Sequence, residues 1–168
     1  LLMTPEISME LQHQIGADIH MAFDECAAPL ASIDYLTEAV ERTHTWAERC
    51  LLRHQALNAE HASKSENLQA LYGVVQGARD ESLRRASASF LGQRDFDGYG
   101  LGGIFEPGEI SSVVRWVNGT LPEGKPRHLL GMGAQPADLF LGVEYGIDTF
   151  DCVAPTRQAR NATLFTLD

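Results

Sequence analysis

The chain has 168 residues, of which 44% are hydrophobic, and its formal net charge at pH 7 is −10. This length and apolar content suit one folded domain with a core, and they argue against a disordered chain. The acidic balance argues against a nucleic-acid-binding surface that covers the whole molecule, but it does not exclude a local basic patch.

The first third of the sequence predicts a helix, a strand and a second helix. Residues 5–15 place apolar side chains at helical spacing, and Gly16 is suited to end that helix. The apolar segment 17–23 reads as a strand that ends in acidic residues. Ser32 is a suitable N-cap for a long helix to about residue 57, and residues 59–67 are polar and loop-like.

The same alternation continues to the end of the chain. Further strands are predicted at residues 71–75, 96–101, 127–130 and 146–150, and further helices at 80–90, 109–117 and 136–145. We expect the arginines of the 80–90 helix to lie on its outer face.

Five predicted strands alternate with helices, and most are nearly continuous in apolar residues, as in parallel strands buried on both faces. Polar residues follow the carboxyl ends of all five. This favours an α/β fold of the (β/α)8 TIM-barrel type, with a doubly wound open sheet as the alternative. Because such a barrel takes about 250 residues, we expect residues 1–168 to supply about five β/α units of one catalytic domain, with further strands upstream.

Cysteines, hydropathy and histidines give no sign of a metal site or a membrane. Cys26, Cys50 and Cys152 lie far apart in the sequence, and no apolar run approaches the roughly 20 residues that cross a bilayer. The acidic N-terminal segment lacks signal-peptide features. We therefore expect a reduced, cytoplasmic protein outside the membrane. The histidines show no ligand spacing, and we interpret all of them as structural or solvated: His13, His20, His44, His54, His61 and His128.

The stretch 146–161 carries the strongest chemical signal. Its apolar run ends in Asp151, and a proline-broken turn with Arg157 and Arg160 follows. A carboxylate at the end of a buried strand, beside two arginines, suggests covalent chemistry on a nucleotide or sugar. An aspartate that caps the turn, with two exposed loop arginines, is the alternative interpretation.

Several motifs follow one another over nearly the whole chain. They are Gly16-Ala17-Asp18-Ile19 with Phe23-Asp24-Glu25-Cys26, Gly73-Val74-Val75-Gln76-Gly77, Asp95-Phe96-Asp97-Gly98-Tyr99 with Gly102-Gly103, Lys125-Pro126-Arg127, and Phe150-Asp151-Cys152-Val153 with Pro155-Thr156-Arg157 and Ala159-Arg160-Asn161. In this order they resemble the motifs of the bacterial tRNA-guanine transglycosylase (queuine tRNA-ribosyltransferase) family. The resemblance implies a zinc-containing TIM barrel that exchanges the anticodon wobble guanine of tRNA for 7-aminomethyl-7-deazaguanine, and a homodimer that binds one tRNA.

The resemblance also implies roles for single residues. Asp151 would be the nucleophile, because retention at the anomeric carbon requires two inversions and hence a covalent intermediate. Arg157 and Arg160 would contact the tRNA. The base would be bound by Asp24, Cys26, Gln76, Gly103, Ile104 and Leu130. Taken singly, each of these has a plain alternative: a solvated loop aspartate, a structural cysteine, a tight turn, or core packing, which we also favour for Tyr99.

Two parts of the family pattern lie outside the sequence. One is an upstream Asp-Ser-Gly-Gly segment with a second aspartate, the expected general acid/base. The other is a downstream structural zinc site of three cysteines and a histidine, so we predict no metal ligands in this chain. Two other functions stay open: a non-catalytic transglycosylase-like subunit that supports tRNA binding or assembly, and a small-molecule TIM-barrel enzyme.

Overall fold

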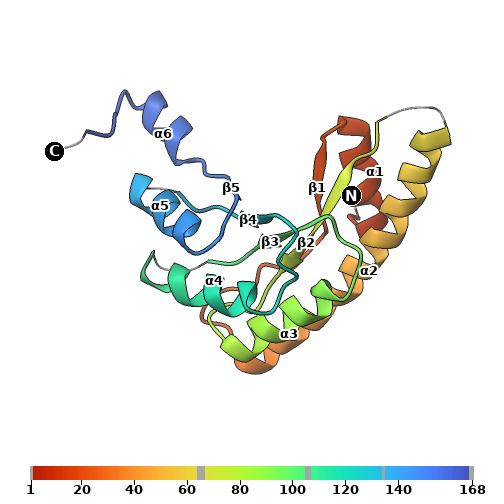
Figure 1. Ribbon diagram of the computed structural model, residues 1–168, viewed down its shortest axis with the longest axis horizontal. Coiled ribbons are helices and arrows are strands. Elements are labelled where there is room, and N and C mark those ends of the chain that lie inside the picture. The colour runs from red at the N-terminus through yellow and green to blue at the C-terminus, as the bar shows by residue number, and fades with distance from the viewer. Residues whose placement is uncertain (1, 64–66, 105–106, 134, 167–168) are drawn as a thin grey trace.

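The fold is a five-stranded parallel sheet with helices on its outer side, seen in a computed structural model that describes residues 2–63, 67–104, 107–133 and 135–166 (Figure 1). The strands are β1 (Ile19–Met21), β2 (Ala70–Val75), β3 (Gly98–Leu101), β4 (Arg127–Leu129) and β5 (Thr149–Phe150). The helices are α1 (Pro5–Ile15), α2 (Ile33–Ser63), α3 (Glu81–Gly92), the short 3-10 helix η1 (Pro107–Glu109), α4 (Ile110–Asn118), α5 (Pro136–Glu144) and α6 (Ala154–Arg160).

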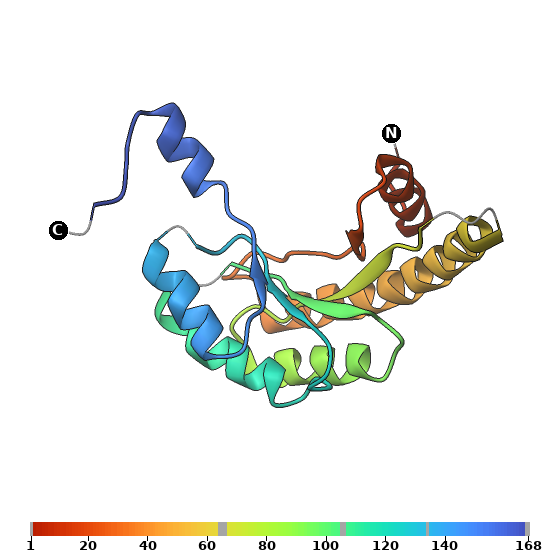
Figure 2. The same ribbon diagram turned by 45° about the horizontal axis from the view of Figure 1, so that its top comes forward.

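The strands lie in the order β1-β2-β3-β4-β5, and every neighbouring pair is parallel. A doubly wound sheet reverses its strand order at a switch point, and no reversal occurs among the described strands. The sheet is therefore a half-barrel of the TIM type, as predicted. In Figure 2 the helices α2, α3, α4 and α5 follow one another along one side of the sheet, which is the outer ring of such a barrel.

The core lies between the sheet and these helices. Leu71 and Val75 of β2 and Leu101 of β3 are fully buried, and Val113 and Val114 of α4 pack into the same cluster. Tyr99 is also fully buried, which confirms its place in the core. This packing holds the strands, and with them the loops at their carboxyl ends, in a fixed arrangement.

Local sequence signals explain where the first helices begin and end. Thr4 caps α1 by accepting a hydrogen bond from the Ile7 amide, and Gly16 ends it at φ 80°, a left-handed conformation that glycine adopts without strain. The Ser32 hydroxyl accepts a hydrogen bond from the Tyr35 amide at the start of α2. Asp80 caps α3 through the Leu83 amide. These caps match the predicted boundaries.

Three expectations were wrong in part. Four of the strands are shorter than predicted, because fewer of their residues pair in the sheet, whereas β2 begins one residue earlier, at Ala70. The helix α2 continues to Ser63, so the predicted polar loop fails for residues 59–63, while residues 64–66 lie outside the described ones. The turn expected after Asp151 is the helix α6, because Pro155 sits in its first turn, where the missing amide proton costs nothing.

Candidate active site

The predicted site residues follow the carboxyl ends of the strands. Asp24 comes three residues after β1, Gln76 directly after β2, and Leu130 directly after β4. Gly103 follows β3, and Asp151 directly follows β5. Because all five strands are parallel neighbours, these residues lie along one edge of the sheet.

The partly buried Asp24 and the buried Gln76 form a pair at this edge. The Gln76 side-chain amide donates a hydrogen bond of 2.6 Å to Oδ2 of Asp24, and Gln76 is only 4% exposed. Burial raises the pKa of the Asp24 carboxyl, and the hydrogen bond from Gln76 acts in the opposite direction. The neighbouring Glu25 turns away and pairs with Arg42 of α2 at 2.7 Å. Asp24 therefore offers a desolvated carboxylate that a ligand with paired N–H donors could meet.

Gly102 keeps Gln76 in place, a role that the sequence did not reveal. A Cβ on Gly102 would lie 2.5 Å from Nε2 of Gln76 and 2.9 Å from a methyl carbon of Val74. Any side chain there would push Gln76 away from Asp24. The next residue, Gly103, has a φ of +123°, which residues with a side chain rarely adopt. The glycine pair thus serves the turn and also the position of Gln76.

Arg84 holds the backbone on both sides of Gln76 from within the core. We expected it on the outer face of α3, but it is fully buried. Its guanidinium donates to the carbonyl of Val75 at 2.9 Å and of Ala78 at 2.8 Å, and so fixes the backbone on both sides of Gln76. Burial lowers the pKa of Arg84 to about 9.

Cys26 lies close enough to the Asp24–Gln76 pair for the charge of Asp24 to affect the pKa of its thiol. Cys26 is exposed as a residue, yet partial burial of its thiol raises its pKa, and the charge of Asp24 adds to that rise. The Gly103 backbone acts in the opposite direction, which places Cys26 beside the loop after β3. The structure therefore brings together four of the predicted base-binding residues: Asp24, Cys26, Gln76 and Gly103.

Asp151 is held by hydrogen bonds from β4 and the loop after it, and not by the turn that follows Asp151. Its Oδ1 accepts hydrogen bonds from the Gly131 amide at 2.9 Å and from Nε2 of His128 at 3.1 Å. Nδ1 of His128 in turn contacts the Thr149 hydroxyl at 2.8 Å. The residue at the N-cap of α6 is Val153, without a side-chain cap, so Asp151 does not cap that helix. One oxygen is anchored, and the side chain stays 58% exposed.

His128 is the second residue that sequence reasoning missed. We interpreted it as structural or solvated, but it orients the candidate nucleophile. The signal lay in strand register, since His128 pairs with Thr149 across β4 and β5. Register is invisible until the sheet is known.

The other predicted residues lie around this edge. Leu130 is half-buried, and its Cδ1 comes within 3.3 Å of the place where a Cβ of Gly100 would be, so it lies over β3. Ile104 is 59% exposed and precedes two residues outside the described ones. Arg157 and Arg160 are exposed on α6, and no residue of this helix is buried.

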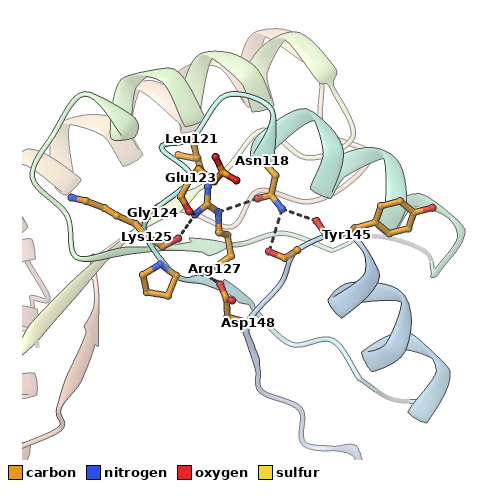
Figure 3. Close-up of a pocket in the computed structure, with 10 residues that line it drawn as sticks. Asn118, Leu121, Glu123, Gly124, Lys125, Arg127, Tyr145 and Asp148 are labelled. Atoms are coloured by element: carbon orange, nitrogen blue, oxygen red, sulfur yellow. Dashed lines mark hydrogen bonds between the residues drawn. The ribbon is translucent and has the colours of Figure 1, made fainter.

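A large cavity lies at the opposite ends of the strands. It measures about 770 Å³ and is lined by residues around Arg127 and Asp148, at the amino ends of β4 and β5 (Figure 3). The Arg127 guanidinium is occupied by the carbonyls of Pro122 and Glu123 and by Asn118. Asp148 accepts from the Arg127 amide at 2.7 Å. These contacts tie loops together, so we place the chemistry at the carboxyl ends.

The chain is similar over its full length to proteins of one family. The family model described as queuine tRNA-ribosyltransferase matches residues 1–168. A queuine tRNA-ribosyltransferase of Bacillus cytotoxicus is 47% identical over 99% of this chain and 42% of its own length. One of Shouchella clausii is 44% identical, and one of Anoxybacillus flavithermus is 46% identical, over the same shares. The chain thus spans about two fifths of the length of these curated relatives.

The half-barrel fold and the family match over residues 1–168 point to the same family. The chain belongs to the queuine tRNA-ribosyltransferase family.

Proposed function

We propose that the whole protein is a tRNA-guanine transglycosylase, a pentosyltransferase that exchanges the wobble guanine of tRNA for 7-aminomethyl-7-deazaguanine. The observation that carries the proposal is the anchored carboxylate of Asp151 at the same edge of the sheet as the partly buried Asp24–Gln76 pair. One carboxylate faces solvent, where a ribose can approach, and the other is desolvated, as recognition of a base requires.

Asp24 and Gln76 would read the polar edge of the base. The carboxylate of Asp24 can accept from the ring N–H and the exocyclic amino group of a guanine-type base. The amide of Gln76 can both donate and accept, and would meet the carbonyl edge. Gly103 and Ile104 would contribute backbone groups, while Cys26 and Leu130 would line the ring. Cys26 mildly favours the aminomethyl base.

Asp151 would attack C1′ of the ribose, forming a C1′–O bond as the C1′–N9 bond to guanine breaks. The departing guanine takes the electron pair and a proton from an acid, for which the resemblance implies an aspartate outside this chain. The incoming base, having lost its N9 proton, then attacks C1′ and displaces Asp151. Two inversions restore the original configuration. Hydrogen bonds from Gly131 and His128 would hold one carboxylate oxygen and leave the other free to attack.

Arg157 and Arg160 would bind the anticodon loop. They are cations on an exposed helix next to the nucleophile, in a chain whose net charge is −10. A local basic element suits phosphate contacts, and guanidinium planes also stack on unpaired bases.

We also propose, from family membership, a cytoplasmic homodimer with a structural zinc held elsewhere in the protein. The cysteines of this chain do not suit that zinc, since Cys50 is buried with its thiol bonded to the Pro5 carbonyl, and Cys26 is exposed. The alternative of a non-catalytic subunit is less favoured, because the candidate nucleophile and the base-binding pair are both present.

The test is incorporation of labelled guanine into a tRNA with a wobble guanine by the complete protein. Asp151→Asn, which keeps the shape but not the charge, should lower exchange by about 10⁴-fold or more. The variant should also fail to form a covalent complex with tRNA on denaturing gels. Full exchange by Asp151→Asn would remove Asp151 from this role, and no exchange by the wild type would favour the subunit alternative.

A further inference from the structure

Three histidines from different elements of the fold meet where α1, β1 and α2 pack together. His13 comes from α1, His20 from β1 and His54 from α2, and all three are buried. Ring centroids lie 4.6 Å apart for His13 and His20, and 5.0 Å apart for His13 and His54. One ring nitrogen from each residue lies within 4.8 Å of the others. We interpreted these residues as having no ligand spacing, and the fold supplies it.

Several of these ring nitrogens lack hydrogen-bond partners. Nδ1 of His13 and both ring nitrogens of His20 are buried without a bond that meets hydrogen-bond geometry. The Ala17 backbone lies near enough to His20 to favour its protonated form, but it does not offset the effect of burial. Buried polar atoms are nearly always paired with protein, water or an ion. This cluster therefore has unused binding capacity.

We propose that His13, His20 and His54 form a binding site for a divalent transition-metal ion of the Zn²⁺ class. Imidazole nitrogens suit Zn²⁺, Co²⁺, Ni²⁺ and Cu²⁺, whereas Mg²⁺ and Ca²⁺ take oxygen ligands. No carboxylate belongs to the three-residue group. The site is separate from the candidate active site and uses no cysteine.

The geometry needs only a small adjustment. Ligands about 2.0–2.1 Å from a tetrahedral zinc ion lie roughly 3.4 Å apart. Nε2 of His13 and Nδ1 of His54 are already 3.0 Å apart. A ring nitrogen of His20, which lies within 4.8 Å of the other two, would have to move closer to them.

The charge state of the rings suits metal binding. Burial, followed by the neighbouring histidines, lowers the pKa of His13 to about 4. Burial is also the largest cause of the lowered pKa values of His20 and His54. Neutral imidazoles keep a lone pair free for an ion.

Binding of a metal ion would have to change the hydrogen bond between Asn58 and His54. Its amide is fixed by the Gln69 backbone through bonds of 2.8 and 3.1 Å, and it faces Nε2 of His54 at 3.1 Å. Because Nε2 of His54 accepts from Asn58, the proton of the neutral His54 ring is on Nδ1, which donates a hydrogen bond to Nε2 of His13. An ion would replace that proton, His54 would carry one on Nε2, and its contact with Asn58 would open.

A cavity of about 310 Å³ gives the cluster a route to solvent. It is lined by His13 together with Glu10, Arg53 and His61, among others. The His61 ring lies 5.1 Å from that of His13. Water from this cavity could complete the coordination of an ion held by three imidazoles.

The test measures metal in the complete protein, purified after growth with added Zn²⁺ and then desalted. The wild type should contain one equivalent of zinc more than His20→Leu, whatever other zinc the protein holds. The matched control is His44→Leu, since His44 is a partly buried histidine of the same helix α2 that stacks on Phe90, outside the cluster. It should keep the wild-type zinc content.

Two further measurements guard against misfolding of the variant. Added Co²⁺ should give the absorption of a tetrahedral nitrogen site in the wild type and His44→Leu, and bind about ten-fold more weakly or worse in His20→Leu and His54→Leu. Zn²⁺ should raise the Tm of the wild type more than that of folded His20→Leu. Equal metal content in the wild type and His20→Leu, with equal Co²⁺ spectra, would overturn the proposal.

Discussion

The two halves of the strand edge are built differently. At the ends of β1 and β2, Asp24 and Gln76 are desolvated and supported from below by the fully buried Arg84. At the ends of β4 and β5, Asp151 is anchored through one oxygen but is 58% exposed, and the following helix α6 buries no residue. Under the proposed function, the desolvated pair would contact the base, and the exposed region around Asp151 would receive the tRNA.

The strongest test of the buried half is Asp24→Asn. Exchange should fall by about 10²-fold or more, because the neutral amide presents an N–H to the donors of the base. Stability should rise by about 0.5–2 kcal/mol at neutral pH, since the pKa of Asp24 is raised in the folded protein and its charge there opposes folding. The gain should shrink as the pH falls through that raised pKa. Guanine exchange and thermal unfolding measure both effects, and a less stable Asp24→Asn would contradict this view of the pocket.

Gln76→Leu separates the charge of Asp24 from its partner. Losing the Gln76 hydrogen bond removes the contact that lowers the pKa of Asp24, so that pKa should rise further. In the proposed function, base binding would need the ionised carboxylate. Exchange should fall about ten-fold or more at neutral pH, and its acid limit should move to higher pH. Arg157→Ala is the control, with an unchanged acid limit. An acid limit that stays in place in Gln76→Leu would disconnect the pair from base binding.

His128→Phe probes the anchor in the exposed half. We expect kcat to fall by about ten-fold with KM for the base unchanged, because Gly131 still holds Asp151 but its angle loosens. His128→Gln can still donate a hydrogen bond and should recover most of the loss. Steady-state kinetics would show it. Equal defects in both variants would mean that His128 only packs.

The smallest expected effect belongs to the arginines of α6. Arg157→Ala should raise KM for tRNA a few-fold and flatten its dependence on salt by about 0.7 in the log–log slope. Arg85→Ala is the matched control, since Arg85 is an exposed arginine of α3 paired with Glu81. If both variants behave alike, α6 does not lie on the tRNA path.

The sequence was sufficient for the order of the elements and for most strand-end residues. Apolar runs and polar ends are local signals, and caps such as Thr4 and Asp80 fix boundaries nearby. What the sequence could not show depends on packing between elements. From the sequence, Arg84 is expected at the surface, but it is buried because its guanidinium donates hydrogen bonds to the carbonyls of Val75 and Ala78.

The histidines show the same limit over a longer range. His13 and His54 lie 41 residues apart and touch only because α1 packs on α2. His128 gains its role from strand register, and Gly102 from the path of the Gln76 side chain.

None of the described helices combines the length and apolar character needed to cross a bilayer.

The strand order also bears on how the chain folds. Every strand pairs with the strand that directly precedes or follows it in the sequence. Each crossover joins strands that are consecutive in the chain, so folding can advance in one direction as the ribosome releases the polypeptide. The meeting of α1, β1 and α2 is then complete before β4 and β5 emerge. Within residues 1–168, the histidine cluster would therefore assemble before the carboxylate of Asp151 reaches its place.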